Sequence, residues 1–395
     1  MKITVIGASG YVGSNVAFIL ALQGLADELV LVAPNRTNLV EHLAMDMATA
    51  ITDKKVIIRP GGYDDMKDSN IVIMCGGAPQ GLIKSRMEML DKNLPIIRDV
   101  GEKVRIGYLP EYRALDPEWG KCLTDLIYFS IQPLPDGSLD NSALNIQTLQ
   151  MLREMHTAYG TRIHVSIGGW ERSNNFAPMA TEPKARKNFV GNLISFCLEN
   201  ELDGIDFDWE FPENEREIQA YADLLTEVKA AFRPRGWIVS VALAPSDQIN
   251  LAPYAAVDRI HIMSYDRGSK HATPEQAQQD VALFLSTGVA QKRLILGMPF
   301  YGRSITPPHE EYLYAEIMAR YHPSPTTDEV DNIYFNGIGT IQQKTCLAKT
   351  ERLGGVMVWE LGQDSHDDTS LLSHAVFTWF SVAINLCFLE HRASS

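Results

Sequence analysis

The sequence lacks the cysteine pattern of a disulfide framework or a zinc site. Its five cysteines are odd in number, widely scattered along 395 residues, and never arranged as Cys-x-x-Cys. Disulfide-stapled folds and zinc-held domains need regular cysteine spacing, so neither class is indicated and no metal site is predicted. We expect single buried thiols at these positions. They are Cys75, Cys122, Cys197, Cys346 and Cys387.

Excess positive charge and a long apolar run are also missing. With 35 lysines and arginines against 49 aspartates and glutamates, the net charge is −14. That balance argues against nucleic acid or an anionic membrane as the partner, whereas a neutral polymer such as a sugar chain fits it. The apolar stretch 375–389 is short for a membrane span and contains Asn385. We expect the last helix of the fold there.

The first residues show no signal peptide. Met1 leads directly into a β-rich run and a glycine turn, without a long apolar run or a small-residue cleavage site. On this pattern we expect a cytoplasmic protein. Hydrophobic content of 45% and charged content of 21% are typical of a globular chain with a full core. The length suits two domains, or one barrel with an extension.

A glycine turn follows the first predicted strand. Residues 2–6 form a short β-rich run, and Gly7, Gly10 and Gly13 come next, at the start of a helical stretch. The later elements of this βαβ pattern are strands at 28–33, near Val56 and near Ile71, and a helix at 37–49. Glycines at such a junction let backbone N–H groups approach a pyrophosphate at a helix N-terminus. A tight turn without a ligand is the alternative.

Residues 1–103 resemble the N-terminal part of the lactate/malate dehydrogenase family. The motifs are Gly7-Ala-Ser-Gly10-Tyr-Val-Gly13, Glu28-Leu-Val-Leu-Val, Ala44-Met-Asp46-Met, and Cys75-Gly-Gly-Ala-Pro79 leading to Ser85-Arg86. The resemblance implies a partial Rossmann-like domain in which Gly7, Gly10 and Gly13 would bind NAD(P).

Departures from that family argue against dehydrogenase activity. The acid that normally holds the ribose 2′-hydroxyl is replaced by Ala33, and Arg36 nearby suits a 2′-phosphate better. Gln80 stands where the family has its first substrate-loop arginine, which leaves only Arg86. The second half of the dehydrogenase is absent, and His42, the only histidine before residue 104, lies in the helix after the second strand. We therefore expect no hydride transfer.

From residue 104 onward strands alternate with helices, with no Pro/Gly/Ser linker before them. This alternation is typical of a (β/α)8 TIM barrel, whose sites lie at the C-terminal ends of the strands. The predicted strands are 104–108, 125–132, 162–168, 204–210, 237–244, 257–265, 293–300 and 355–359. The unusual residues at their ends are Tyr108, Trp170, Glu210, Tyr265, Asp266 and Trp359.

The most informative stretch is Asp203-Gly-Ile-Asp206-Phe-Asp208-Trp-Glu210. Side chains alternate faces along a strand, so Asp206, Asp208 and Glu210 share one face, each about 6–7 Å from the next. Like charges this close oppose ionisation and raise at least one pKa. This row of acids therefore indicates acid–base chemistry rather than packing.

Residues 104–380 resemble glycoside hydrolase family 18, the chitinase family. The motifs are the acid row, Ser166-Ile-Gly-Gly-Trp170, Met263-Ser-Tyr265-Asp266, Gly297-Met-Pro-Phe-Tyr-Gly302 and Val358-Trp359-Glu360. They stand in the family's order at the ends of five predicted strands. Residues 302–341 leave little room for the insertion that some members carry, which implies an open cleft.

The resemblance implies a retaining mechanism in which the 2-acetamido oxygen of the substrate attacks C1. Glu210, nearest the barrel mouth, would donate the proton to the glycosidic oxygen. Asp208 would orient the acetamido N–H, because it lies on the same strand as Glu210 and is poorly placed to attack from the opposite side. Asp206 would share a proton with Asp208. A structural role is the alternative for Asp206.

Residues from other strands complete the predicted site. Tyr265 would donate to the acetamido carbonyl, and Asp266 would bind substrate or Tyr265. Trp359 would form a floor under the sugar, and Trp170 would do the same in a neighbouring subsite, with core packing as the alternative for both. Weaker candidates for substrate contact are Met263, Tyr108 and Tyr301. We expect His164 and His261, inside strands, to be satisfied core histidines.

The predicted organisation is a partial Rossmann-like domain at 1–103, a barrel at 104–380 and a tail at 381–395. The predicted function is hydrolysis of β-1,4 linkages in N-acetylglucosamine polymers or oligomers, without a required cofactor or a metal. The alternatives are a non-catalytic chitin-binding lectin on the same barrel and an endo-β-N-acetylglucosaminidase acting on N-glycans. The presence of both Glu210 and Asp208 argues against the lectin.

Overall fold

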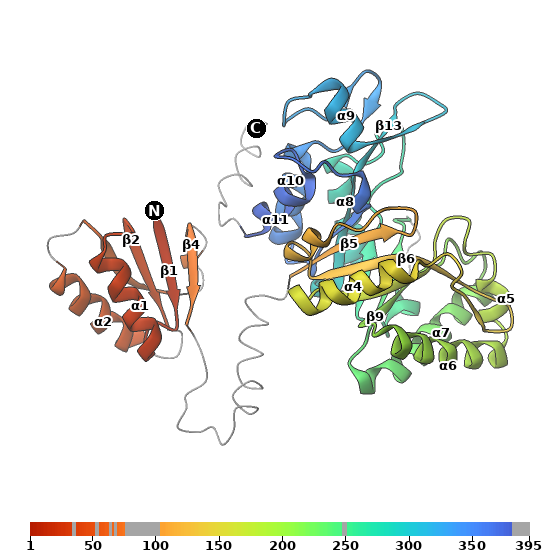
Figure 1. The fold of residues 1–395 in the computed structure, drawn as a ribbon, viewed down its shortest axis with the longest axis horizontal. Helices are drawn as coiled ribbons and strands as arrows, with labels where there is room; N and C mark the ends of the chain where they lie inside the picture. The colour runs from red at the N-terminus through yellow and green to blue at the C-terminus, as the bar shows by residue number, and fades with distance from the viewer. Residues whose placement is uncertain are drawn as a thin grey trace. The chain divides into compact units, whose positions relative to one another are not determined.

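The chain divides into two compact units. The computed structural model describes residues 1–33, 37–51, 55–62, 65–66, 69–75, 103–246 and 251–380. The first unit begins at Met1 and the second spans Lys103–Thr378 (Figure 1). The predicted tail, 381–395, lies outside the described residues. Within the described part of the chain, no helix has the length and apolar character needed to cross a membrane.

The first unit is a parallel sheet with helices between its strands. Its strands lie in the order β3-β2-β1-β4 and all pair in parallel. The elements are β1 (Lys2–Ile6), α1 (Tyr11–Leu22), β2 (Glu28–Val32), α2 (Thr37–Ala50), β3 (Ile57–Gly61) and β4 (Ile71–Met74). Small residues of α1 such as Ala17 and Ala21 pack on Val5 and Leu31 of the sheet. This order is half of a doubly wound fold, which confirms the Rossmann-like prediction.

The second unit is a closed barrel of eight parallel strands. They are β5 (Val104–Pro110), β6 (Asp125–Pro133), β8 (Arg162–Gly168), β9 (Gly204–Asp208), β10 (Ile238–Leu243), β11 (Arg259–Ile262), β12 (Leu294–Pro299) and β17 (Gly355–Trp359). Each strand pairs with the next, and β17 returns to β5. The (β/α)8 prediction is confirmed, and each predicted strand agrees with an observed one to within a few residues.

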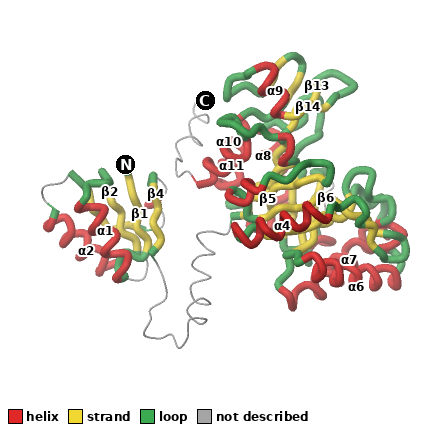
Figure 2. Tube along the Cα trace, in the orientation of Figure 1, coloured by secondary structure: helices red, strands yellow, loops and turns green. Residues whose placement is uncertain are grey.

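Helices surround the strands of the barrel (Figure 2). They are α4 (Ile146–Tyr159), α5 (Phe176–Ala180), α6 (Pro183–Asn200), α7 (Glu215–Phe232), α8 (Pro274–Ser286), α10 (Ile338–Thr350) and α11 (Leu371–Phe380). Local sequence sets their ends. Thr273 and Gln276 form a capping box at the start of α8, with Pro274 in the first turn. Gly160 ends α4 in the left-handed conformation, at φ 73°.

A small antiparallel sheet is inserted between β12 and α10. Its strands lie in the order β14-β13-β16-β15. The elements are β13 (Tyr301–Ser304), β14 (Glu311–Leu313), α9 (Tyr314–Tyr321), β15 (Glu329–Val330) and β16 (Ile333–Tyr334). The short segment expected from the sequence therefore still holds a folded insertion, because its strands are only two to four residues long.

The cysteines follow the sequence expectation with one exception. Cys75, Cys122 and Cys197 are free thiols, and only Cys197 is fully buried. Cys346 is disulfide-bonded, which corrects the expectation of single thiols throughout. Spacing carried no signal for this bond, since pairing depends on which residues the fold brings together.

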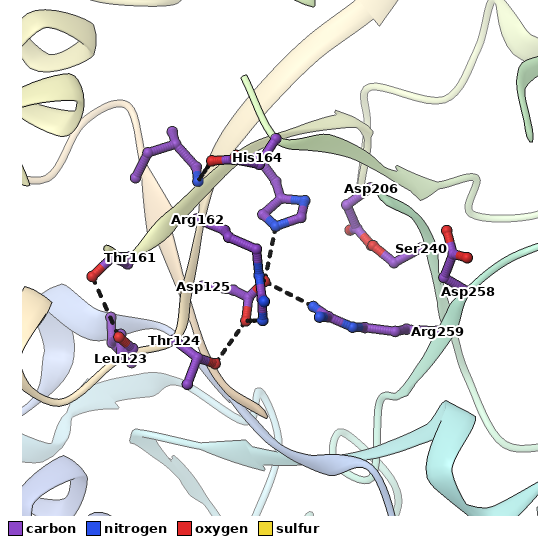
Figure 3. Close-up of polar contacts among 12 residues, drawn as sticks. Leu123, Thr124, Asp125, Thr161, Arg162, His164, Asp206, Ser240, Asp258 and Arg259 are labelled. Carbon is purple, nitrogen blue, oxygen red and sulfur yellow. Dashed lines mark hydrogen bonds and ion pairs between the residues drawn. The ribbon is translucent and has the colours of Figure 1, made fainter. Parts of the chain in front are cut away.

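A charged cluster closes the base of the barrel (Figure 3). Asp125, 1% exposed at the start of β6, accepts two hydrogen bonds of 2.7 Å from the Arg162 guanidinium. Arg259 donates to it at 2.8 Å, and His164 Nε2 lies 3.0 Å from Oδ1. Burial alone would raise the pKa of Asp125, but the hydrogen bonds from Arg162 and His164 and the charge of Arg259 hold it well below its usual range.

We expect Asp125→Asn to lower the free energy of unfolding by about 3–5 kcal/mol at pH 7, because it leaves two arginines without their shared anion. The lowered pKa means that this stabilisation is complete above the unfolded pKa, about 3.9, and is lost as the pH falls through the folded pKa. Urea unfolding of the wild type and the variant measures it. Exposed Asp136→Asn is the control, and a loss below about 1 kcal/mol would contradict the account.

Candidate active site

Two acids of the row lie inside the barrel. Asp206 and Asp208, on β9, are 0% and 5% exposed, and Glu210, just beyond the strand, is half-buried. The intervening Phe207 faces outward, with its ring 6.4 Å from that of Phe189 on α6. The strand thus divides acids from aromatics between its two faces, as the alternation predicts.

Hydroxyl groups from three other strands surround Asp206. Ser240 of β10 donates to Oδ1 at 2.6 Å, and Tyr108 of β5 donates to Oδ2 at 2.7 Å. Ser166 of β8 lies 3.4 Å from Oδ2. His261 Nδ1 is 2.8 Å from the Tyr108 hydroxyl. Burial raises the pKa of Asp206 to about 6, although these hydrogen bonds act in the opposite direction.

Asp208 and Glu210 are both held toward the protonated form. Burial raises the pKa of Asp208, and the charges of Glu210 and Asp206 raise it further. Its buried Oδ1 has no hydrogen-bond partner among the described residues. Burial, followed by the charge of Asp266, raises the pKa of Glu210 to about 7. A carboxyl group in this state can deliver a proton near neutral pH.

An aromatic group lines the same end of the barrel. The Trp359 ring lies 4.9 Å from that of Phe129 and 5.6 Å from that of Tyr108. Trp359 and Met263 are only partly buried and pack against a cluster that includes Tyr265. Burial and then the charge of Asp208 raise the pKa of Tyr265, so its hydroxyl keeps its proton near neutral pH. The structure therefore brings Tyr265, Trp359 and Met263 to the acid row.

Asp266 occupies a special backbone position beside the acids. Its φ of 62° is left-handed, and its Oδ1 accepts from the Tyr301 hydroxyl at 2.8 Å and from Arg303 at 2.9 Å. His271 Nδ1 lies 3.4 Å from the same oxygen. Burial would raise the pKa of Asp266, but His271, Tyr301 and Arg303 together lower it. A hollow of about 460 Å³ opens here, lined by Asp266, Gly268, Ser269, Arg303, Ile305, Pro307 and His309.

Trp170 lies on the surface rather than in the core. It is 71% exposed, and it follows Gly168 and Gly169, whose φ angles are 94° and 102°. A Cβ on Gly169 would come within 2.2 Å of the Phe129 ring. The core-packing alternative therefore does not hold for Trp170, whereas Trp359 does pack partly against the aromatic cluster.

Several functional partners were not found from the sequence. Ser240 pairs in register with Asp206 across β9 and β10, but an isolated serine in an apolar strand gives no signal of its own. Arg303 stands just after the Gly297–Gly302 motif, and no pattern in the sequence marks it as a partner of Asp266. His261 and His164 do lie inside strands as expected. His261 Nε2 and His164 Nδ1, however, are buried without a partner in the described part of the chain.

The glycine turn of the first unit has part of a nucleotide site. Gly7 has a φ of 78°, and a Cβ on Gly13 would lie 2.2 Å from the Gly7 carbonyl oxygen, so α1 packs closely on the turn. Gly10 precedes α1 without a side-chain cap. Ala33, buried after β2, supplies no carboxylate for a ribose. Arg36, like Gln80 and Arg86, lies outside the described residues.

A row of acids with a raised pKa, met by a tyrosine and a tryptophan at the C-terminal end of a (β/α)8 barrel, defines a glycoside hydrolase. Across the described residues, no group of three or more His, Cys, Asp or Glu could hold a metal ion. The chain belongs to the glycosyl hydrolases family 18, whose family model matches residues 106–364.

The relatives agree with this family. Chitinase 1 of Aphanocladium album is 26% identical over 288 residues, which are 58% of this chain and 67% of that enzyme. Probable chitinase 10 of Drosophila melanogaster is 27% identical over 180 residues, only 8% of its length. The crystal structure of a chitinase from Flavobacterium johnsoniae aligns with a TM-score of 0.61 and 26% identity, covering 70% of this chain and 94% of that one.

The first unit has relatives of its own. Residues 1–108 match the model of the lactate/malate dehydrogenase NAD binding domain. L-lactate dehydrogenase of Bacillus caldotenax is 39% identical over 105 residues, which are 26% of this chain and 32% of that enzyme. The chain thus spans about a third of the dehydrogenase, and both resemblances seen in the sequence are confirmed.

The contribution of Asp266 to the pKa of Glu210 can be measured by titration, without an activity assay. The charge of Asp266 raises the pKa of Glu210, so Asp266→Asn should lower the midpoint at which the Glu210 carboxyl titrates. Carbon-13 NMR of protein labelled at glutamate carboxyls measures this midpoint, with Glu210→Gln identifying the resonance. An unchanged or higher midpoint in Asp266→Asn would contradict the assignment.

Proposed function

We propose that the barrel hydrolyses β-1,4 linkages next to N-acetylglucosamine, with retention of configuration and with Glu210 as the acid and base. One observation carries the proposal. Glu210, with a pKa raised to about 7, stands beside Asp208, whose Oδ1 is unpartnered among the described residues. The first group can give a proton, and the second can accept one hydrogen bond from a substrate.

The nucleophile in this proposal is the substrate itself. A retaining glycosidase usually attacks with a second carboxylate about 5–5.5 Å from the acid, and family 18 is a recognised exception. Asp208 ends the strand that leads directly into Glu210, so it would face the same side of a bound sugar. The 2-acetamido oxygen would attack C1 while Glu210 protonates the leaving oxygen. Glu210 then takes a proton from the water that opens the oxazolinium ring.

Asp208 and Tyr265 would orient the acetamido group. Asp208 Oδ1 would accept from its N–H, and the Tyr265 hydroxyl would donate to its carbonyl oxygen, which removes rotational freedom before attack. Asp206, held by Ser240 and Tyr108, would share a proton with Asp208 as charge develops. A shared proton suits a buried pair in which both carboxyl groups have a raised pKa.

Aromatic surfaces would bind the sugar rings. Trp359 would lie beneath the ring that is attacked, with Met263 beside the acetamido methyl, and exposed Trp170 would stack in a neighbouring subsite. Asp266 would bind a sugar hydroxyl. The names of the relatives support an N-acetylglucosamine substrate. In addition, a class V chitinase from Nicotiana, with 20% identity and a TM-score of 0.61 over 70% of this chain and 99% of its own, was solved in complex with NAG4.

Turnover of a fluorogenic chitobioside tests the function. We expect the wild type to release the fluorophore, and Glu210→Gln to lose at least about 10²-fold in kcat/KM, the usual scale for general acid catalysis. Exposed Glu213→Gln is the control and should retain activity. A wild type that binds chito-oligosaccharide without cleaving it would favour the lectin. Cleavage of N-glycans alone would favour the endo-β-N-acetylglucosaminidase.

The first unit has no step in this reaction. Its glycine turn has the form that can bind a phosphate group at a helix N-terminus, but Ala33 offers no carboxylate to bind a ribose. NAD(P), if bound, would supply hydride chemistry that this hydrolysis does not use. Titration of the full chain with NADH and NADPH should give dissociation constants of about 1 mM or weaker. Micromolar NADPH binding would contradict this expectation.

A further inference from the structure

A buried lysine lies behind the loop that carries Asp266. Lys344 of α10 is 1% exposed. Its Nζ donates to the backbone carbonyl of Ala272 at 2.9 Å and to Asn336 Oδ1 at 2.7 Å. Asn336 Nδ2 donates to the same carbonyl at 2.8 Å. Helix α10, the inserted segment and the loop 266–272 therefore meet at one oxygen atom.

An amine is a costly group for such a position. Burial lowers the pKa of Lys344 to about 7, which shows how poorly the charged form is solvated there. An apolar side chain would fill the space without that cost. What the amine adds is a pair of directed hydrogen bonds that an apolar chain cannot make. The charged and titratable groups that face it are Asp280 and Glu275 of α8, Asp328 of the inserted segment and His271 of the loop.

The Ala272 carbonyl, which Lys344 and Asn336 hold, directly follows His271, whose side chain contacts Asp266. His271, 1% exposed, precedes Ala272, and its Nδ1 lies 3.4 Å from Asp266 Oδ1. The His271 ring packs on Tyr301, with 5.0 Å between ring centres. Tyr301 is also a hydrogen-bond donor to Asp266. A shift of the backbone at 271–272 would therefore move the His271 and Tyr301 side chains that contact the Asp266 carboxylate.

We propose that Lys344 is a positioning residue that, with Asn336, fixes the loop 266–272 and so holds the Asp266 carboxylate in its place against Tyr301 and His271. Lys344 touches neither the substrate nor the reacting atoms, and it acts only through this loop. The inference deepens the proposed hydrolase function and rests on it. With this role, α10 and the inserted segment also contribute to the site, although Lys344 and Asn336 lie outside the motifs that contain the catalytic residues.

The expected consequence is a change in the pKa of Glu210, which Lys344 does not touch. Asp266 raises the pKa of Glu210, and the interaction of two charges weakens with their separation. Without the clamp that Lys344 and Asn336 form, the loop can relax, and the mean separation between the Asp266 and Glu210 carboxyl groups can grow. The pKa of Glu210 then falls, so the acid loses its proton at a lower pH.

Two variants and a matched control test the clamp. Lys344→Met keeps the length of the side chain without the donors, and Asn336→Ala removes the second arm. Lys349→Met is the control, because Lys349 is on the same helix and donates to a backbone carbonyl, that of Thr378, at 2.9 Å. The readouts are the pH profile of kcat/KM on the chitobioside and the carbon-13 titration of Glu210.

We expect Lys344→Met and Asn336→Ala to move the high-pH limb of kcat/KM and the Glu210 midpoint down by about half a pH unit. The value of kcat/KM at pH 7 should fall about 5-fold or more, and Lys349→Met should change neither readout. Because the clamp acts through Asp266, adding Lys344→Met to Asp266→Asn should shift the Glu210 midpoint no further.

Several outcomes would overturn the inference. A folded Lys344→Met or Asn336→Ala with lower stability but an unmoved midpoint would leave Lys344 with a packing role alone. A full additional shift in the double variant would show an effect that bypasses Asp266. If the wild type does not hydrolyse the chitobioside, the proposed function fails, and the NMR titration still decides the clamp. If Lys344→Met does not fold, Asn336→Ala decides it.

Discussion

The structure depends on raising the pKa of carboxyl groups inside a barrel that also contains strong cations. Asp125 and Asp206 are both fully buried on the inner side of barrel strands, yet their pKa values move in opposite directions. Two arginines bind Asp125 at the base of the barrel. Among the described residues, the hydroxyls of Ser240 and Tyr108 donate to Asp206. The His261 imidazole, with Nδ1 3.3 Å from Oδ1, has a pKa that burial lowers to about 3, so it adds no positive charge near neutral pH. An arginine beside Asp206 would hold it ionised and would lower the pKa of the acids above it. With the arginines held at Asp125, burial and the charge of Asp266 can raise the pKa of Glu210 to about 7.

The same constraint explains the neighbours of the acid row. Hydroxyls of Ser240 and Tyr108 satisfy Asp206 without adding charge, so burial is not fully offset. Arg303 donates to Asp266 and helps to lower its pKa, so Asp266 keeps its negative charge. That charge adds to burial in raising the pKa of Glu210.

Much of the fold and the centre of the site could be predicted because their signals are local. Alternation along residues 204–210 placed the three acids on one face, and regular spacing of strands and helices indicated a barrel. The partners of those acids could not be predicted in the same way. Ser240 meets Asp206 through strand register, Arg303 reaches Asp266 from the inserted sheet, and Cys346 forms a disulfide that no spacing signalled. Such contacts depend on closure of the fold and carry no periodicity in the sequence.

The two units show why a motif alone does not make a site. The first unit keeps a glycine turn of the form seen in nucleotide-binding folds, but the position expected to bind a ribose holds Ala33, which has no carboxylate. In the barrel, the acids of β9 and Glu210 just beyond it share one end of the barrel with Tyr265 after β11, Trp359 of β17 and Tyr108 of β5, which donates to Asp206. Each of these adds a different property: a donor, a stacking surface, or a hydrogen bond to a neighbouring acid. Catalytic function follows from this convergence of strands, because a proton donor without an oriented substrate gains little over free solution.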